Sequence, residues 1–517
     1  MKFKYFVYLA SFILLFIYSA LGFIYFNWYS QIIKVNDSSI TSRIKSVIAS
    51  EIVELIGNET FSKAYSFNTP FLSTQSDYKF IFSEKDKFIN DSIINIASNS
   101  EKLRSFSDSL RSWRKAKFTT PEGTYKIKYK FHGTSLTPFE IDLASFKIKS
   151  KFPVNGFKSF RLYSSREGPY IRIFINNLAK KYGLISEGIG SYMPVSGYKG
   201  TNLYLQSSGF SDEYLKANYN IENPIRFKSS DSWFRQAEEV HVNNLDGVGY
   251  AVEWNNDMPL DTIEKNYLKK FINIRSGDQS HLNSQNYKYF GKFLALLYFF
   301  GHPHQVTGDN DTWINFNKNL LPIYRNEGRI DALNFNKFQL DNNFWNIYYP
   351  TKTLNPYKKL LLNDSIKYYR DKTFEKIISD RDVLINQFDS IFQYNKESIY
   401  KYDKDYYKTK KMHNFYRQNI KNNINLLSNY LKVTELAAFI DNDTINVSAD
   451  SYVNIDIIIN DKLLSVIKPR EYNLKQDQIV SPIINHKLYF ADKVDKIIFR
   501  NSITKDTIND ERLILIY

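Results

Sequence analysis

The chain is 517 residues long, has a net charge of +15 and contains no cysteine. The lack of cysteine excludes disulfides, a thiolate nucleophile and a cysteine-ligated zinc site. The basic balance favours an anionic partner such as an acidic polymer, although a composition rich in Lys, Ile and Asn produces the same charge without any partner.

The first element expected is an N-terminal membrane anchor. No charged residue lies between Lys4 and Lys34, and Phe6–Ile33 is apolar and long enough to span a bilayer as a helix. Lysines before the span predict a cytoplasmic N-terminus, so the protein would be a single-pass cell-membrane protein with most of the chain outside. A cleaved signal peptide ending near residues 19–22 is the alternative. Because both alternatives export the chain, we expect no nucleic acid as a partner.

Changes in residue pattern divide the chain into five expected regions. These are the anchor at 1–33, a helical stalk or linker at 34–77, a main domain at 78–350, a helical extension of it at 351–432 and a small β-sandwich-like domain at 433–517. The last region is assigned from short β runs separated by Asn and Asp, and the one before it from helical runs rich in Lys, Tyr and Leu. The pattern predicts an α+β fold.

Within the main domain, periodicity predicts several strands and an amphipathic helix. Apolar residues at helical spacing predict a helix over Tyr170–Tyr182 that ends at Gly183. The expected strands are Tyr125–Phe131, Phe157–Tyr163, Tyr192–Val195 and Asn202–Gln206. Glycines separate the last two strands, which is typical of a hairpin turn.

The segment that most resembles a functional site is residues 301–331, which follow an apolar run at Tyr287–Phe300 that predicts a buried helix. The segment contains two histidines, four acids and six amides. Its carboxylate and amide oxygens suit Mg²⁺ or Ca²⁺, whereas His302 and His304 would suit zinc but lack an obvious third ligand. The alternative is an ordinary turn, because Asn, Asp and Gly are common in turns. The candidate oxygen ligands are Asp309, Asn310, Asp311 and Asn315.

Three segments, taken in order, resemble the CotH spore-coat kinase family of atypical kinases. They are KIKYKFHGTSL at 126–136 with SFKIKSKF at 145–152, the segment at 168–206, and the motifs HPHQVTGDN, WINFN and LLPIYRNEG within 302–328. The resemblance implies a two-lobed kinase-like domain that binds ATP and Mg²⁺ or Mn²⁺. It also implies transfer of phosphate to surface or envelope proteins.

The resemblance further implies roles for particular residues. The implied nucleotide-binding residues are Gly133, Ser135, Lys147 and Lys149, the implied catalytic residues are Asp309 and His304, and the implied metal ligands are Asn310, Asp311 and Glu327. Two departures from the family pattern are Glu327 in place of a metal-binding aspartate and Gln206 where an acidic residue often follows the hairpin.

These observations lead to one expected function and two alternatives. The expected function is a membrane-anchored, outward-facing phosphotransferase. The first alternative is a catalytically inactive scaffold or binding protein for cell-envelope or surface-polymer assembly, which the two departures favour. The second is a glycan hydrolase using Asp309 and Asp311, but two acids two residues apart in a loop give no support from spacing.

Overall fold

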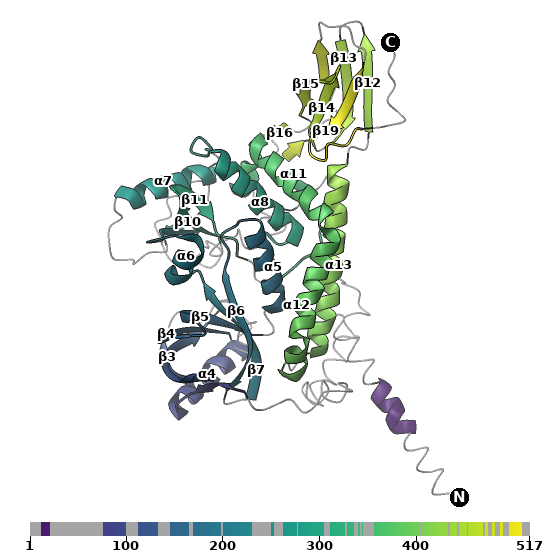
Figure 1. Cartoon of the computed structure of the whole chain (residues 1–517). Helices are drawn as coiled ribbons and strands as arrows, with labels where there is room; N and C mark the ends of the chain where they lie inside the picture. Colours follow the sequence, from purple (N-terminus) through teal and green to yellow (C-terminus); the bar gives the residue numbers. More distant parts are fainter. Residues whose placement is uncertain are drawn as a thin grey trace, which may run out of the picture.

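The computed structural model shows a barrel, a helical body and a small β domain (Figure 1). It describes residues 12–20, 76–99, 112–132, 145–164, 169–197, 200–229, 250–252, 262–276, 278–303, 311–325, 328–334, 340–341, 344, 356–402, 406–432, 435–441, 444–451, 453–468, 471–473, 478–480, 486–489 and 496–508.

The N-terminal part is a closed barrel with strand order β1-β2-β3-β4-β5-β7-β6. Its strands are β1 (Tyr78–Ile81), β2 (Arg114–Thr120), β3 (Gly123–Phe131), β4 (Phe146–Val154), β5 (Phe157–Ser164), β6 (Gly188–Gly197) and β7 (Gly200–Gly209), and α4 (Glu84–Asn99) follows β1. Neighbouring strands are antiparallel except β1 and β6, whose parallel pairing closes the barrel. Alternate residues such as Tyr129, Ile148 and Phe160 point inward and form an apolar core.

The helical body is built around the buried helix α8 (Ser284–Phe300). Asn283 caps its N-terminus, and Gly301 ends it with a φ of 63°, a conformation that glycine adopts easily. Around it lie α5 (Pro169–Lys181), α6 (Asp212–Tyr219), α7 (Thr262–Ser276), α10 (Pro356–Leu360), α11 (Asp364–Ser379), α12 (Arg381–Tyr402) and α13 (Tyr406–Leu431). A sheet of order β11-β10-β8-β9 completes the body, with β8 (Arg226–Ser229), β9 (Tyr250–Val252), β10 (Thr312–Phe316) and β11 (Asn319–Pro322).

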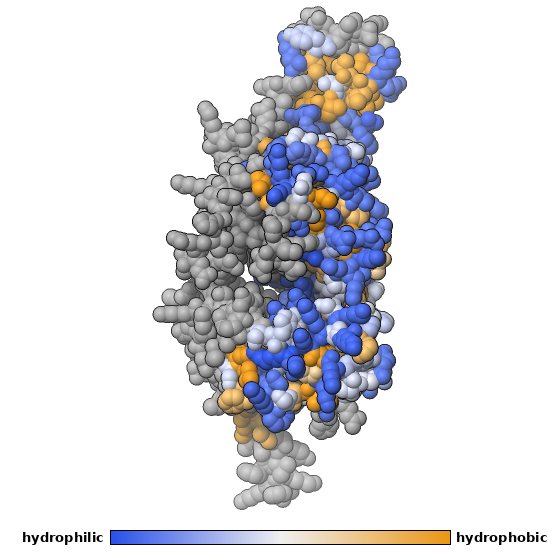
Figure 2. Space-filling model, turned by 90° about the vertical axis from the view of Figure 1, so that its left-hand side faces the viewer, coloured by the Kyte–Doolittle hydropathy of each residue, from blue (hydrophilic) through white to orange (hydrophobic). Residues whose placement is uncertain are grey.

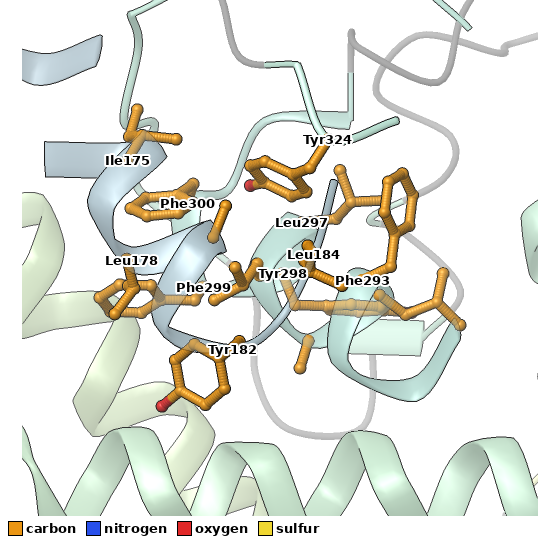
Figure 3. Packing of buried hydrophobic residues seen from close by; sticks show 14 of the residues in the cluster. Ile175, Leu178, Tyr182, Leu184, Phe293, Leu297, Tyr298, Phe299, Phe300 and Tyr324 are labelled. Carbon is orange, nitrogen blue, oxygen red and sulfur yellow. The ribbon is translucent and has the colours of Figure 1, made fainter. Parts of the chain in front are cut away.

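The contact between α5 and α8 fixes the segments that lead to the candidate site. Ile175 and Leu178 of α5 lie against the aromatic end of α8, where Phe300 packs in the same cluster (Figure 3). Tyr324 joins this cluster, with its ring centroid 5.5 Å from that of Phe293. The apolar contacts therefore hold the ends of α5 and β11 close together.

The C-terminal strands form a small β domain with a core of its own. Its sheets have the orders β12-β13-β18, β15-β14-β19 and β16-β17. The strands are β12 (Glu435–Asp441), β13 (Thr444–Asp450), β14 (Ile455–Ile459), β15 (Lys462–Ile467), β16 (Glu471–Asn473), β17 (Gln478–Val480), β18 (His486–Tyr489) and β19 (Ile497–Asn501). Val453 and Ile503 insert into the core of the helical body, and Asn501 Nδ2 donates a 2.8 Å hydrogen bond to the carbonyl of Leu431.

Most individual elements expected from periodicity are confirmed. The predicted strands of the main domain lie within β3, β5, β6 and β7, and the predicted helices correspond to α5 and α8. The expected helical stalk or linker at 34–77 lies outside the described residues except for residues 76 and 77.

The predicted two-lobed kinase-like fold is wrong, because β1 to β7 form a closed barrel. Closure depends on β1, which pairs in parallel with the distant β6 through Tyr78 and Val195. Alternation in the sequence identifies strands, but it does not reveal that the first strand of a sheet meets a later one at its far edge.

The predicted transmembrane anchor at Phe6–Ile33, and the single-pass membrane localisation that followed from it, are also contradicted. Within the described residues, no helix is long and apolar enough to cross a membrane. Of the anchor segment the structure describes residues 12–20, which are helical.

Candidate anion-binding site

A fully buried carboxylate, Glu187, lies between α5 and β6 where the barrel meets the helical body. Its Oε1 accepts hydrogen bonds from Arg161 Nη1 at 3.1 Å, Tyr163 Oη at 2.7 Å and Ser207 Oγ at 2.8 Å. Its Oε2 lies 3.8 Å from Nη1 of Arg172. A carboxylate tolerates complete burial only with compensating partners of this kind.

These partners keep Glu187 ionised. Burial alone would raise the pKa of Glu187, but the charges of Arg161, Arg172 and Arg325, together with the hydrogen bond from Tyr163, hold it below its ordinary value. Burial also raises the pKa of Tyr163, so that its hydroxyl stays protonated and donates to the carboxylate.

The cationic side chains come from separate elements. Arg161 and Tyr163 lie two residues apart on β5 and therefore share its outer face. Arg172 extends from α5 and places its guanidinium carbon 4.0 Å from the centre of the Tyr163 ring, a cation–π contact. Lys147 of β4 is directly opposite Arg161 in the barrel.

Arg325 reaches the same region through a short backbone pairing. Ser186 and Tyr324 form an isolated parallel bridge, in which the Tyr324 amide donates a 2.7 Å hydrogen bond to the carbonyl of Ile185. Ser186 immediately precedes Glu187, and Tyr324 immediately precedes Arg325. The bridge therefore places these two charged residues on adjacent backbone segments. The packing of α5 against α8 holds this bridge in place (Figure 3).

His132 directly follows β3, and burial and the charges of this region lower its pKa. Its ring centroid lies 5.5 Å from that of Tyr163. Burial, followed by the charges of Arg161, Arg325, Arg172 and Lys147, holds the pKa of His132 well below its ordinary value. Its imidazole is therefore neutral at pH 7. We call the set formed by His132, Lys147, Arg161, Arg172 and Arg325 the basic cluster.

The chemistry of the basic cluster suits a phosphate-bearing ligand. Guanidinium groups offer paired donors that match phosphate oxygens, and a lysine ammonium adds a compact positive charge. Among these described side chains, four cations accompany one carboxylate. Charges in a region of low dielectric attract an anion more strongly than they do in water.

Two of the lysines implied by the family resemblance are described. Lys147 belongs to the basic cluster. Lys149 lies on the exposed outer face of β4, and its ammonium is 5.1 Å from the centre of the Trp113 ring. Asp311 is buried, and its Oδ1 accepts hydrogen bonds from Trp313 Nε1 at 2.8 Å and Tyr357 Oη at 2.5 Å. The remaining implied residues lie outside the described part of the chain, namely Gly133, Ser135, His304, Asp309, Asn310 and Glu327.

The histidine considered as a zinc ligand has another partner. Nδ1 of the buried His302 lies 2.8 Å from the Asp331 carboxylate. In the part of the chain that the structure describes, no group of three or more His, Cys, Asp or Glu residues is arranged to hold a metal ion.

The sequence did not point to Glu187 or to the three arginines of the basic cluster. Arg161 and Glu187 are separated by 26 positions, and they meet because β7 pairs with β5 on one side and with β6, which follows Glu187, on the other. The sequence did contain one partial indication of this site. Arg161 lies within the predicted strand Phe157–Tyr163 and places a charge on the face that it shares with Tyr163.

No protein-family model matches the chain, and no curated protein sequence matches it. The resemblance to CotH kinases therefore depends on the three sequence segments alone and stays a prediction.

Proposed function

We propose that the chain binds a phosphate-bearing ligand at the basic cluster and acts as a divergent phosphotransferase. The convergence of Lys147, Arg161, Arg172 and Arg325 near His132 supports the binding step. The three segments that resemble the CotH family support the transfer step. ATP is the proposed phosphoryl donor.

Each residue of the cluster has a separate part in this proposal. Arg161 and Arg172 are held by Glu187, so their guanidinium groups are oriented before a ligand arrives. Arg325 and Lys147 supply further positive charge near His132. Phosphoryl transfer depends mainly on positioning and on neutralising charge, which is what fixed cations provide.

We assign no step to Mg²⁺ or Mn²⁺. The one implied metal ligand that the structure describes, Asp311, is a poor fit because its Oδ1 already accepts hydrogen bonds from Trp313 and Tyr357. This observation favours a second candidate function, a binding protein that retains the phosphate site without catalysing transfer.

Thermal unfolding of the full chain with pyrophosphate or ATP tests the binding step. A ligand at a hundred times its Kd stabilises the folded state by about 2.7 kcal/mol. We expect stabilisation of the wild type and a loss of most of it in Lys147→Gln and Arg325→Gln. Lys265→Gln and Arg381→Gln are matched controls, because both residues are exposed on helices of the body. Equal stabilisation by chloride at the same ionic strength would contradict the proposal.

Incubation with γ-labelled ATP then separates the two candidates. A phosphotransferase incorporates label into itself or into an added acceptor, and Lys147→Gln should reduce that incorporation together with the thermal shift. A binding protein shows the thermal shift without any incorporation.

A further inference from the structure

The outer faces of three adjacent barrel strands carry lysines at most of their outward positions. They are Lys115 and Lys117 on β2, Lys126, Lys128 and Lys130 on β3, and Lys147, Lys149 and Lys151 on β4. We call this set the lysine array. None of the three strands contains an aspartate or glutamate.

Strand register aligns these lysines in rows. Lys128 pairs with Lys115 on one side and with Lys149 on the other, and Lys126 pairs with Lys117. Strands lie about 4.8 Å apart and alternate residues along a strand about 6.8 Å apart, so the charges form a regular grid. Like charges directly opposite each other destabilise a sheet, and an anion placed between them would relieve that repulsion.

The grid faces solvent. Six of its members, Lys115, Lys117, Lys126, Lys128, Lys149 and Lys151, are exposed, and none of these six makes an ion pair within the part of the chain that the structure describes. Figure 2 views the molecule from the side on which Figure 1 places β3 and β4, and hydrophilic side chains cover much of the barrel there.

One row of the lysine array continues into the basic cluster. Lys130 pairs with Lys147, and Lys147 pairs with Arg161. Lys147 and Arg161 belong to the basic cluster, so positive charge extends without interruption from the exposed grid to the buried Glu187. A chain of anionic groups lying on the grid could therefore place one group in the basic cluster.

We infer that the lysine array binds a linear polymer with repeating phosphate groups and presents it to the basic cluster. This inference names the chemical class of the phosphate-bearing ligand in the proposed binding step, and it rests on that step. Two aromatic rings lie beside the described lysines of the array, and lysine ammonium groups cover both. Those of Lys130 and Lys149 lie 5.3 Å and 5.1 Å from the centre of the Trp113 ring, and that of Lys151 lies 5.6 Å from the centre of the exposed Phe152 ring. Lysines occupy the ring faces on which a base would stack. The array therefore favours a ligand with phosphate charges alone over one that also carries bases.

Inorganic polyphosphate is the probe. We expect the full chain to bind it with an affinity that falls steeply as salt rises. The triple variant Lys115→Gln, Lys126→Gln and Lys128→Gln should bind at least tenfold more weakly at low salt, and the slope of log Kd against log salt should fall by about 2 if three contacts are lost. The control variant Lys265→Gln, Lys269→Gln and Lys462→Gln has the same net charge and changes exposed lysines of α7 and β15.

Parallel titrations distinguish other polyanions. The inference would be overturned in favour of a nucleic acid if single-stranded DNA of equal charge bound more tightly than polyphosphate. It would be overturned in favour of a membrane if vesicles with anionic lipid bound more tightly than either. Equal loss of affinity in the control variant would overturn it in favour of general charge attraction.

The same measurements separate this inference from the proposed function. If pyrophosphate stabilises the protein through Arg325 but polyphosphate does not bind the array, the inference alone is wrong. If polyphosphate binds through the array but pyrophosphate gives no stabilisation that depends on Arg325, the proposed function is wrong.

Discussion

Glu187 is the residue on which the geometry of the basic cluster depends, since its carboxylate contacts Arg161, Tyr163, Ser207 and Arg172. Sequence reasoning reached Lys147 because a lysine on a strand of a familiar motif stands out locally. It could not reach Glu187, whose partners lie on β5, β7 and α5, far from it in the sequence, and meet it only in the folded protein.

Replacing Glu187 with glutamine should strongly destabilise the protein. The substitution keeps the shape of the side chain but removes the only negative charge beside Arg161 and Arg172 in the described cluster. Breaking a buried ion pair in this way costs about 3–5 kcal/mol, which chemical denaturation can measure. Glu213→Gln is the control, because Glu213 is exposed and lies 3.9 Å from the exposed Lys158. A change below about 1 kcal/mol for Glu187→Gln, typical of a surface pair, would contradict the role given to this carboxylate.

The same residue predicts a dependence of stability on pH. The folded-state pKa of Glu187 lies below its ordinary value, because the arginine charges outweigh the effect of burial. Its stabilisation is therefore fully present above the unfolded pKa of about 4.3 and is lost as the pH falls through the folded pKa. The unfolding free energy, measured from pH 6 downward, should decrease more steeply below the unfolded pKa of about 4.3 for the wild type than for Glu187→Gln. Parallel curves for the two proteins would show that Glu187 has no such shift.

At the scale of elements, α8 was predictable and the barrel was not. A run with apolar residues on all sides, such as Tyr287–Phe300, predicts a buried helix, and this prediction does not depend on knowing which elements surround it. The barrel depends on the four-residue strand β1, which is too short to predict by alternation and yet closes the sheet. The helix that packs against α8 could not be predicted either, because it is α11, which begins 80 positions after the start of α8.

Gly291 marks the closest approach of α8 and α11. A Cβ at this position would lie 2.5 Å from Tyr369 Cβ and 2.8 Å from the backbone nitrogen of Arg370, so the two helices would have to separate. Gly291→Ala should lower the unfolding free energy by about 1–3 kcal/mol, although alanine alone favours a helix by about 1 kcal/mol. Lys288→Ala, at an exposed position of the same helix, should change it by less than about 0.5 kcal/mol. A Gly291→Ala variant more stable than the wild type would show that the helices do not approach this closely.

At the scale of the whole molecule, the net charge of +15 indicated an anionic partner without indicating where it would bind. The structure concentrates much of this charge on one barrel wall and at the junction with the helical body. The C-terminal β domain lies at the opposite end of the body (Figure 1) and has its own core. The sequence predicted its β texture, but not that two of its residues, Val453 and Ile503, belong to the core of the body.

Ile503→Asp tests whether the insertion of Ile503 into the core of the body couples the small β domain to the rest of the molecule. Ile503 is buried in the main core, so an aspartate there would place a charge in an apolar contact and detach the domain. Because the domain keeps its own core around Ile457 and Phe499, calorimetry should show two unfolding transitions where the wild type shows one. Ile457→Ala, as a control, should lower the stability of the small domain by about 2–5 kcal/mol without breaking its contact with the body. Stabilisation by pyrophosphate should survive in Ile503→Asp, because the basic cluster comes from the barrel, α5 and the segment after β11 and includes no residue of the small β domain. Loss of that stabilisation in a folded Ile503→Asp protein would show that the two ends of the molecule are coupled.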